Sequence, residues 1–564
     1  MKIKIDGKRF SAKEGETILN VAKRNKIYIP TLCYHPDLKP QGRCRVCLVE
    51  VDGKLVTSCN TKVMDNMEIF TNTKRVKEAR KLNIELIYNN HSGEKELEFS
   101  VVAKELGIKK SRFEKPKKEI KSPMERDNMK CLLCGRCVQV CGAIQSINNI
   151  EFTDRGISTR ISTPYDISIK DSACTFCGQC ALYCPGNAIR ERAYNEKVVR
   201  SLMEEMNKII NKKKFIIAQT APAVRASLGE MFGMKPGTLV TGKMVTALRK
   251  LGFDKVFDTD FGADLTIMEE ANEFVGRMKE KKNLPLITSC CPAWIKFAEQ
   301  TFPFLLKNIS TCKSPHQMLG AIAKTYYAQK LKLKPKDLMI VSIMPCIAKK
   351  FEAQRPEMKI SGCNDVDVVL TTREIGRIIK KEKINFTDLR DGEFDDPLGI
   401  SSGGGAIFGV TGGVMEAALR VAYEILTGKR LKEIDFNQVR GFEGIREADI
   451  KIDNKIIKIG VVHGLGNIRK FIESGRWKKY HFIEMMACPG GCIGGGGQPR
   501  PTTNEIRKKR MEALYRQDKK MKIRMSNKNP AIKKLYLEFL GEPLGEMSKK
   551  LLHTKYKKRK VKYT

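Results

Sequence analysis

Two cysteines near the end of the chain lie in a segment that is almost free of bulky side chains. Cys488 and Cys492 are separated by Pro-Gly-Gly, and a run of glycines follows from Gly494 to Gly497. Two thiolates at this spacing converge only where the backbone turns sharply, and glycine allows the required dihedral angles and close approach. The segment therefore suits a large inorganic group bound by thiolates. The alternative is a glycine-rich turn that holds two buried thiols.

Two further cysteine segments favour the metal interpretation. Cys290 and Cys291 precede Pro292 in one of them, and Cys346 lies three residues before Lys349 in the other. Together the three segments resemble the three active-site signatures of the iron-only (FeFe) hydrogenases, in their spacing and in most of the intervening residues. The resemblance extends over most of the chain, because the segments upstream and downstream are similar to that family's accessory domains.

The resemblance implies an H-cluster, a 4Fe-4S cube joined through a cysteine sulfur to a two-iron unit that carries carbon monoxide, cyanide and a bridging dithiolate amine. Hydrogen is nonpolar and nearly non-acidic, so splitting it requires a Lewis-acidic metal beside a base. By resemblance, Cys492 bridges to the two-iron unit, and the ligands of the cube are Cys291, Cys346, Cys488 and Cys492. The residues that the resemblance places around the cluster are Pro222, Met344, Phe408 and Met486.

Cys290 is left without a place in the cube. Two adjacent cysteines in an extended loop point in different directions and cannot readily bind the same iron. In the family, the neighbour of the ligand passes protons to the bridging amine, and a thiol suits this task because its reference pKa is about 8.5. The alternative is an inert buried thiol, which is our interpretation of Cys312 and Cys363, since neither belongs to a motif.

Glu270 and Glu273 lie three residues apart, a spacing that places them on one face of a helix. The plain interpretation is a solvated helix face. The resemblance instead implies a proton relay from Cys290 through Glu270, Ser310 and Glu273 to Arg277 at the surface. It also implies that Lys349 contacts a cyanide ligand, a role for which an ammonium point charge is suited.

Eight further cysteines form two matched runs with the spacing C-x2-C-x2-C-x3-C. This is the pattern of bacterial two-cluster ferredoxins, in which the fourth cysteine of each run binds the other cluster. By that rule the first 4Fe-4S cluster is bound by Cys131, Cys134, Cys137 and Cys184. The second 4Fe-4S cluster is bound by Cys141, Cys174, Cys177 and Cys180. Zinc is the alternative.

The four amino-terminal cysteines have the spacing C-x10-C-x2-C-x11-C, which resembles plant-type 2Fe-2S ferredoxin domains and differs from the paired spacing of zinc sites. They are Cys33, Cys44, Cys47 and Cys59. We expect a 2Fe-2S cluster here, against the alternatives of zinc or free thiols. A hairpin is predicted around Asp6-Gly7, followed by a helix whose apolar face carries Ile18, Leu19, Val21 and Ala22.

The segment from 76 to 120 is expected to be a charged helical linker. In many long members of the family, one histidine and three cysteines bind a further cluster here. This chain has His91 but no cysteine between Cys59 and Cys131. We therefore predict no cluster in this segment and interpret His91 as a solvated or capping histidine.

The elements that must position the active-site cysteines read as strands alternating with helices, after an amphipathic stretch from Glu196 to Lys212. Expected strands cover 215–218, 285–288, 338–343, 366–370 and 457–462. This pattern predicts an α/β domain with parallel strands. Cys291 and Cys346 would follow the carboxyl ends of two strands, where ligands of such sheets bind. Pro292 suits the first turn of a helix.

The resemblance completes the expected architecture. The fold class is an α/β catalytic domain of two lobes with parallel sheets around the H-cluster, preceded by a β-grasp 2Fe-2S domain and a two-cluster 4Fe-4S ferredoxin-like α+β domain. The expected boundaries are 1–75 for the 2Fe-2S domain, 76–120 for the linker, 121–200 for the two-cluster domain, 201–505 for the catalytic domain and 506–564 for a segment like the family's small subunit. This last segment is basic and helical, with breaks at 529–530 and 541–543, and its tail from 555 to 563 is expected to be disordered.

Composition limits the partners. At 564 residues the chain exceeds the roughly 250–300 residues of a single core. The net charge of +40 lacks an accompanying nucleic-acid-binding module, so we expect no nucleic acid as a partner. We interpret the charge as lysine-rich background or as steering for an acidic electron carrier.

No apolar run is long enough to span a membrane, and no signal peptide is evident, so a cytoplasmic location is predicted. In an unexported chain, 19 cysteines favour metal sites over disulfides.

The expected reaction is the reversible reduction of protons to H2, with electrons from an acidic ferredoxin or flavodoxin and with maturation proteins that load the two-iron unit. Three alternatives stay open. A related iron-sulfur assembly protein would need neither Cys290 nor Glu270 and Glu273. A hydrogen sensor would carry a sensory extension. A subunit of an NAD(P)-linked complex would rely on flavin or nicotinamide partner subunits, since this chain has no such site.

Overall fold

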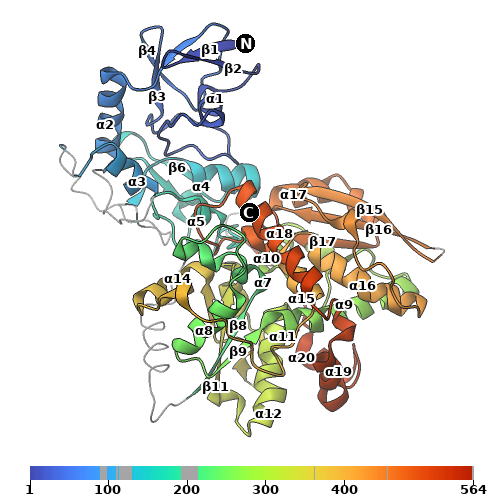
Figure 1. Ribbon diagram of the computed structural model, residues 1–564. Helices are drawn as coiled ribbons and strands as arrows, with labels where there is room; N and C mark the ends of the chain where they lie inside the picture. Colours follow the sequence, from blue (N-terminus) through green and yellow to red (C-terminus); the bar gives the residue numbers. More distant parts are fainter. Residues whose placement is uncertain are drawn as a thin grey trace. The chain divides into compact units, whose positions relative to one another are not determined.

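The computed structural model describes residues 1–88, 98–109, 112, 127, 130–191, 214–360, 362–453 and 455–561. The chain forms two compact units (Figure 1). The first comprises Met1–Ala143, Asn148–Ser172 and Tyr183–Arg192, and the second comprises Ile144–Ile147, Ala173–Leu182 and Ala193–Thr564. His91 and the stretch expected at 196–212 lie outside the described residues.

The first unit begins with a five-stranded sheet in the order β2-β1-β5-β3-β4. Its strands are β1 (Lys2–Ile5), β2 (Lys8–Ser11), β3 (Leu48–Val51), β4 (Lys54–Thr57) and β5 (Glu68–Phe70). The hairpin between β1 and β2 turns at Asp6-Gly7, where both residues have positive φ, as predicted. Helix α1 (Ile18–Arg24) is capped by the Thr17 hydroxyl and buries its four expected apolar residues.

Two helices follow this sheet in the part expected to be a linker. They are α2 (Lys74–Tyr88) and α3 (Glu98–Glu105). Ile84 of α2 and Phe99 of α3 are fully buried and join an apolar cluster that also contains Cys33, Cys44 and Cys134. The described part of this segment therefore packs against the amino-terminal cysteines as ordinary helical structure.

The remainder of the first unit carries the first ferredoxin-like run. Its elements are α4 (Arg136–Gln139), β6 (Glu151–Thr153) and β7 (Arg160–Ser162), and the two strands pair antiparallel. Arg136 is buried, donates to the carbonyls of Leu32 and Tyr34, and forms an ion pair with Glu98. The turn that carries Cys134 and Cys137 is thereby tied to the loop that carries Cys33.

The second unit contains a four-stranded parallel sheet in the order β14-β11-β8-β9. The strands are β8 (Phe215–Thr220), β9 (Lys255–Asp258), β11 (Leu338–Met344) and β14 (Val368–Thr371). Three of them lie where the sequence predicts strands, and β9 was not predicted. Helices α8 (Thr241–Lys250) and α14 (Thr372–Lys381) pack against strands of this sheet.

A second four-stranded sheet has the order β10-β17-β16-β15. Its strands are β10 (Leu286–Ile287), β15 (Ile445–Ile452), β16 (Lys455–His463) and β17 (Phe482–Met486). Strands β10, β17 and β16 are parallel, as predicted for two of them, whereas β15 is antiparallel to β16 and corrects the expectation of parallel strands. The reason is the short turn after Ile452, where Asp453 has a φ of 48°, since so short a connection allows only a hairpin.

Helix α9 (Thr259–Glu280) contacts both α11 (Pro315–Ile322) and α16 (Gly413–Thr427). It begins at Asp258, the last residue of β9, whose carboxylate accepts a hydrogen bond from the Asp260 N–H. Short helices α7 (Pro222–Arg225), α10 (Pro292–Thr301), α13 (Ala348–Glu352) and α15 (Gly403–Ala406) follow strands or loops near the active-site cysteines, and Pro292 occupies the first turn of α10 as predicted. The unit also contains α12 (Ala328–Lys330) and α17 (Leu465–Glu473).

The carboxyl-terminal segment is helical, as predicted, and consists of α18 (Asn504–Lys520), α19 (Pro530–Leu535) and α20 (Glu546–Leu552). Helix α19 packs on α9, and α20 packs on α11. The expectation of a disordered tail is wrong for residues 555–561. Tyr556 donates to the Cys312 carbonyl, and Arg559 pairs with the buried Glu299, so these contacts order the chain. No helix in the described ranges has the length and apolar character needed to cross a membrane.

Candidate active site

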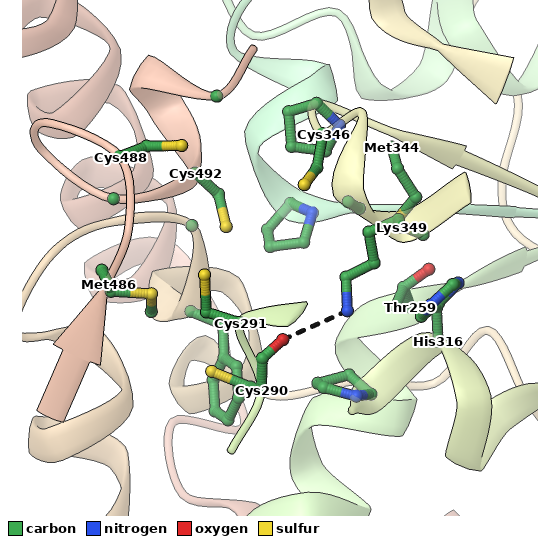
Figure 2. A pocket seen from close by; sticks show the side chains of 18 of the residues that line it. Thr259, Cys290, Cys291, His316, Met344, Cys346, Lys349, Met486, Cys488 and Cys492 are labelled. Carbon is green, nitrogen blue, oxygen red and sulfur yellow. Dashed lines mark hydrogen bonds between the residues drawn. The ribbon is translucent and has the colours of Figure 1, made fainter. Parts of the chain in front are cut away.

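Four cysteine sulfurs face one cavity in the second unit. Cys291 follows β10, Cys346 follows β11, and Cys488 and Cys492 follow β17. Figure 2 shows their sulfur atoms directed toward a common cavity of about 720 Å³, a volume that includes space open to solvent. The cysteines meet because the strands that precede them all end at this cavity, the usual ligand position in parallel sheets.

The glycine run allows the loops to approach one another closely. A Cβ at Gly495 would lie 2.2 Å from the Pro345 carbonyl oxygen, and one at Gly491 would lie 2.8 Å from the Thr411 nitrogen. Gly491 also has a φ of 89°, which disfavours other residues. The first contact places the loop after β17 directly against the loop that carries Cys346, and the second places it against the loop before α16. The sequence signal for this packing was the glycine content itself.

The chemistry of the cavity fits a large metal cluster. Burial raises the pKa of all four thiols, and that of Cys492 reaches about 12. Unpaired thiolates are therefore disfavoured here, whereas a bound metal deprotonates its thiol ligands. The four residues expected around the cluster, Pro222, Met344, Phe408 and Met486, all line the same cavity. This donor set and this mostly apolar lining suit the H-cluster.

Cys290 lines the cavity beside the four sulfurs without joining them. Its sulfur points away from that of Cys291 in Figure 2, and its carbonyl accepts a hydrogen bond of 3.1 Å from Lys349 Nζ. Burial, with a contribution from the charge of Glu270, raises the pKa of the Cys290 thiol well above its ordinary value. At neutral pH this thiol therefore holds its proton.

Lys349 is held by a buried ion pair that the sequence analysis missed. Its ammonium lies 2.9 Å from Glu352 Oε2, and the same oxygen lies 2.7 Å from His316 Nε2. Burial and the nearby Lys349 lower the pKa of His316 to about 4, so the imidazole is neutral. Burial raises the pKa of Glu352, but Lys349 and His316 outweigh it and bring the value to about 2. The i, i+3 spacing of Lys349 and Glu352 was a signal for this pair.

The carboxylates expected in the relay are buried, which excludes a solvated helix face. Glu270 is 1% exposed and Glu273 is 9% exposed. Ser310 Oγ donates to Glu273 Oε2 at 2.8 Å, and Arg277 donates to Glu273 Oε1 at 2.6 Å. The structure therefore brings Ser310, Glu273 and Arg277 into direct contact.

Glu270 interacts electrostatically both with Glu273 and with Cys290. Burial and the charge of Glu273 raise its pKa to about 8, and a contact with the Ser310 hydroxyl opposes the shift. Its Oε1 has no hydrogen-bonding partner in the part of the chain that the structure describes. Glu270 can therefore carry a proton near neutral pH, with one carboxyl oxygen free to exchange it.

In the first unit, the expected 2Fe-2S cysteines lie close together in two pairs. A thiol hydrogen bond from Cys44 lowers the pKa of Cys33 to about 6, and one from Cys59 lowers that of Cys47 to about 7. The same hydrogen bonds raise the pKa of the donors, Cys44 and Cys59. The Cys33 N–H also donates to Cys44 Sγ at 3.4 Å. These sulfurs are arranged as a compact four-thiol set.

The two ferredoxin-like runs divide between the units. Cys131, Cys134, Cys137 and Cys184 line one cavity of the first unit with apolar neighbours. Cys141 belongs to the first unit, whereas Cys174, Cys177 and Cys180 belong to the second, so the second ligand set stays a prediction. Within the second unit, Gln179 donates to the Gly494 carbonyl at 2.9 Å, which places this run beside the glycine loop of the active site.

Comparison with protein families matches four stretches of the chain. Residues 214–496 match the family described as iron only hydrogenase large subunit, C-terminal domain, and residues 504–559 match the iron hydrogenase small subunit. Residues 1–74 match a 2Fe-2S iron-sulfur cluster binding domain, and residues 167–190 match a 4Fe-4S binding domain.

Individual proteins show the same relationship. The NADP-reducing hydrogenase subunit HndD of Solidesulfovibrio fructosivorans is 47% identical over 99% of both chains. Iron hydrogenase 1 of Clostridium pasteurianum is 42% identical over 98% of this chain and 99% of that one. The structure of a variant of [FeFe]-hydrogenase HydA1 from Chlamydomonas reinhardtii is 41% identical, with a TM-score of 0.58 over 64% of this chain and 98% of that chain. With four cysteine sulfurs around one cavity and these matches along its length, the chain belongs to the iron-only hydrogenase family.

Proposed function

We propose that this hydrogenase, an oxidoreductase that interconverts protons and H2 at an H-cluster, moves its protons through Cys290, Glu270, Ser310 and Glu273 to Arg277. The observation that carries the proposal is a protonated thiol that lines the four-cysteine cavity, together with a buried carboxyl group that can hold a proton near neutral pH. Ligation of the cube by Cys291, Cys346, Cys488 and Cys492 belongs to the same proposal.

The H-cluster, when bound, supplies Lewis-acidic iron, electrons and a basic amine. The protein supplies the sulfur ligands, a mostly apolar surrounding and a fixed positive charge. Lys349 is held in place by Glu352 and by the Cys290 carbonyl, so its ammonium is directed into the cavity, where it can contact an anionic ligand of the cluster. Fixed charges in a dry site stabilise developing charge more strongly than solvent does.

Proton movement begins with the thiol of Cys290, which is protonated at neutral pH and delivers its proton into the cavity. Glu270 then returns a proton to Cys290 from its carboxyl group. The hydroxyl of Ser310 connects Glu270 to Glu273, and Arg277 keeps Glu273 at the outer end of the path. In the direction of H2 oxidation the same groups carry protons outward.

Electrons are proposed to arrive through the 2Fe-2S cluster and the two 4Fe-4S clusters bound by the cysteine sets named above. Contacts within the second unit support the last step. A Cβ at Gly496 would lie 2.3 Å from the Cys177 carbonyl oxygen, so the second ferredoxin-like run and the glycine loop pack without an intervening side chain. The proposal also includes five domains in the chain, with boundaries at residues 75, 120, 200 and 505.

The electron donor has two candidates. One is an acidic ferredoxin or flavodoxin, for which the net charge of +40 provides steering. The other is an NAD(P)-linked complex with flavin-containing partner subunits, favoured by the 47% identity to a subunit of an NADP-reducing hydrogenase. Maturation proteins that load the two-iron unit are expected in either case.

One experiment tests the catalytic proposal, and a second separates the donors. The protein should be co-expressed with the maturation machinery, purified anaerobically and examined by infrared spectroscopy, where carbon monoxide and cyanide bands are expected. A cavity that holds only zinc would overturn the proposal. H2 formation should then be assayed with reduced ferredoxin and, separately, with NADPH and a co-purifying flavoprotein. Activity with the second donor alone would favour the complex.

A further inference from the structure

A buried carboxylate next to the relay anchors the carboxyl-terminal segment, residues 504–561. Glu269 is completely buried on α9, directly before Glu270 in the chain. It accepts hydrogen bonds from the Tyr536 hydroxyl, from the Leu544 N–H at 2.8 Å and from His553 Nε2 at 3.0 Å. All three partners belong to the carboxyl-terminal segment, so this segment is fastened to the turn of α9 that carries Glu270.

His553 also holds the second element of the relay. Its Nδ1 lies 2.8 Å from the Thr311 hydroxyl, and the Thr311 N–H lies 3.1 and 3.3 Å from the two carboxylate oxygens of Glu273. An antiparallel bridge joins His553 to Cys312. Around it, the Thr554 N–H donates to the Thr311 carbonyl and the Lys313 N–H donates to the Leu552 carbonyl, both at 2.7 Å.

These contacts converge on neighbours of the proposed relay. Glu269 precedes Glu270 on α9, and Thr311 follows Ser310 in the next loop of the relay. The imidazole of His553 therefore links the helix that carries Glu270 to the loop that carries Ser310. The hydrogen-bond network assigns the proton to Nε2, which then donates to Glu269 while Nδ1 accepts from Thr311. His553 is the residue of the carboxyl-terminal segment that meets both elements through one side chain.

Glu273, Cys312 and His553 have potential ligand atoms within 4.8 Å of one another, which raises the alternative of a metal site. The hydrogen bonds argue against it. Both ring nitrogens of His553 and both oxygens of Glu273 are already engaged by groups of the protein, as buried polar atoms require. These three residues are therefore better explained as part of a clamp, by which we mean the hydrogen bonds of His553 to Glu269 and Thr311.

We propose that His553 is a positioning residue for the proton relay, and that the carboxyl-terminal segment serves catalysis through it. The inference rests on the proposed relay. A displacement of about 1 Å between proton carriers can cost up to about 100-fold in rate. Loss of the clamp therefore slows proton transfer while leaving the four cysteine ligands and the cavity intact.

The test uses the full-length, matured protein and three variants. His553→Ala removes both contacts, His553→Gln can restore one of them, and Lys555→Ala, an exposed neighbour, is the matched control. For His553→Ala we expect H2 evolution to fall by about 10- to 100-fold, with a larger solvent deuterium isotope effect and unchanged infrared bands. His553→Gln should recover part of the rate, and Lys555→Ala should match the parent protein.

Two outcomes would overturn the clamp. The first is unchanged turnover and isotope effect in His553→Ala. The second is a loss of turnover that merely parallels a loss of the infrared bands, because that would indicate a general structural role. Glu273→Gln, measured in parallel, separates a failure of the proposed relay from a failure of the clamp. If it slows turnover while His553→Ala does not, only the clamp is wrong; if neither does, the relay and the clamp both fail.

Discussion

The 2Fe-2S region and the active-site cavity each collect four cysteines, but they do so in opposite ways. Cys33 to Cys59 come from one continuous stretch, and their thiols lie in hydrogen-bonded pairs. In each pair the pKa of one thiol falls, to about 6 for Cys33 and about 7 for Cys47, while that of its partner, Cys44 or Cys59, rises. The cavity draws its cysteines from three remote loops, and burial raises the pKa of each thiol. The local loop thus favours one thiolate in each pair by itself, whereas all four thiols of the cavity depend on a bound metal for their deprotonation.

The largest expected effect comes from removing one ligand on each side of this comparison. Cys346→Ala should abolish H2 turnover and the infrared bands, because the cavity loses a cube ligand that no other loop can replace. Cys47→Ala should remove the 2Fe-2S paramagnetic signal while the infrared bands persist, since the two sites are built independently. Cys363→Ala, outside both sets, is the control. Infrared bands that survive in Cys346→Ala would contradict the assigned ligands.

Within the cavity, Cys290→Ser tests whether the fifth cysteine differs from the four ligands. A hydroxyl gives up its proton far less readily than a thiol, so turnover should fall by about 100- to 10,000-fold. The infrared bands should remain, because Cys290 is not a ligand in this proposal. Steady-state H2 evolution and infrared spectra measure both effects, with Cys363→Ser as the control. Full activity would refute the role of Cys290 in the relay.

Glu352→Gln tests the fixed charge of Lys349 at the cavity, whereas the fixed charge beside the 2Fe-2S loop is Arg136. The variant loses the ion pair that orients Lys349, so turnover should fall by about 10-fold, as for other residues that orient a metal site. The cyanide bands in the infrared spectrum should shift as the ammonium moves. The exposed Glu382→Gln is a matched control. Unchanged cyanide bands would show that Lys349 needs no such support.

The smallest expected effect concerns pH. Glu270 has a folded pKa of about 8, above the ordinary value of 4.5, so its contribution to stability is complete below pH 4.5 and is lost as the pH rises through 8. Between pH 5 and 8, the apparent melting temperature of the parent protein should therefore fall more than that of Glu270→Gln, by about 2 °C. Calorimetry measures this, with the exposed Glu280→Gln as the control. Equal pH dependence in all three would contradict the raised pKa.

The sequence predicted much of what lies close along the chain. The hairpin at Asp6-Gly7, helix α1 and the strands before Cys291 and Cys346 follow from periodicity and turn residues. Strands β9, β15 and β17 of the second unit were missed. Strands β9 and β17 are short and almost wholly buried, so neither shows the alternation of a half-exposed strand.

Contacts between distant side chains escaped sequence reasoning. Glu352 carries no motif that links it to His316. Nothing near His553 in the sequence indicates a contact with Glu269, which lies 284 residues earlier in the chain. The basic tail was expected to be disordered on composition alone. Its order comes from particular partners, such as Glu299 for Arg559, that composition cannot reveal.

The sequence alone contains the cysteine spacing, the glycine content and the adjacency of Cys290 and Cys291. These features were enough to predict the kinds of cluster and the family. Whether four sulfurs meet, which carboxyl group keeps its proton and what steadies Lys349 were decided only by the folded structure. The physical reason is that segments remote in sequence pack together to form the cavity. That packing also determines the desolvation and the neighbouring charges that set the pKa of Glu270.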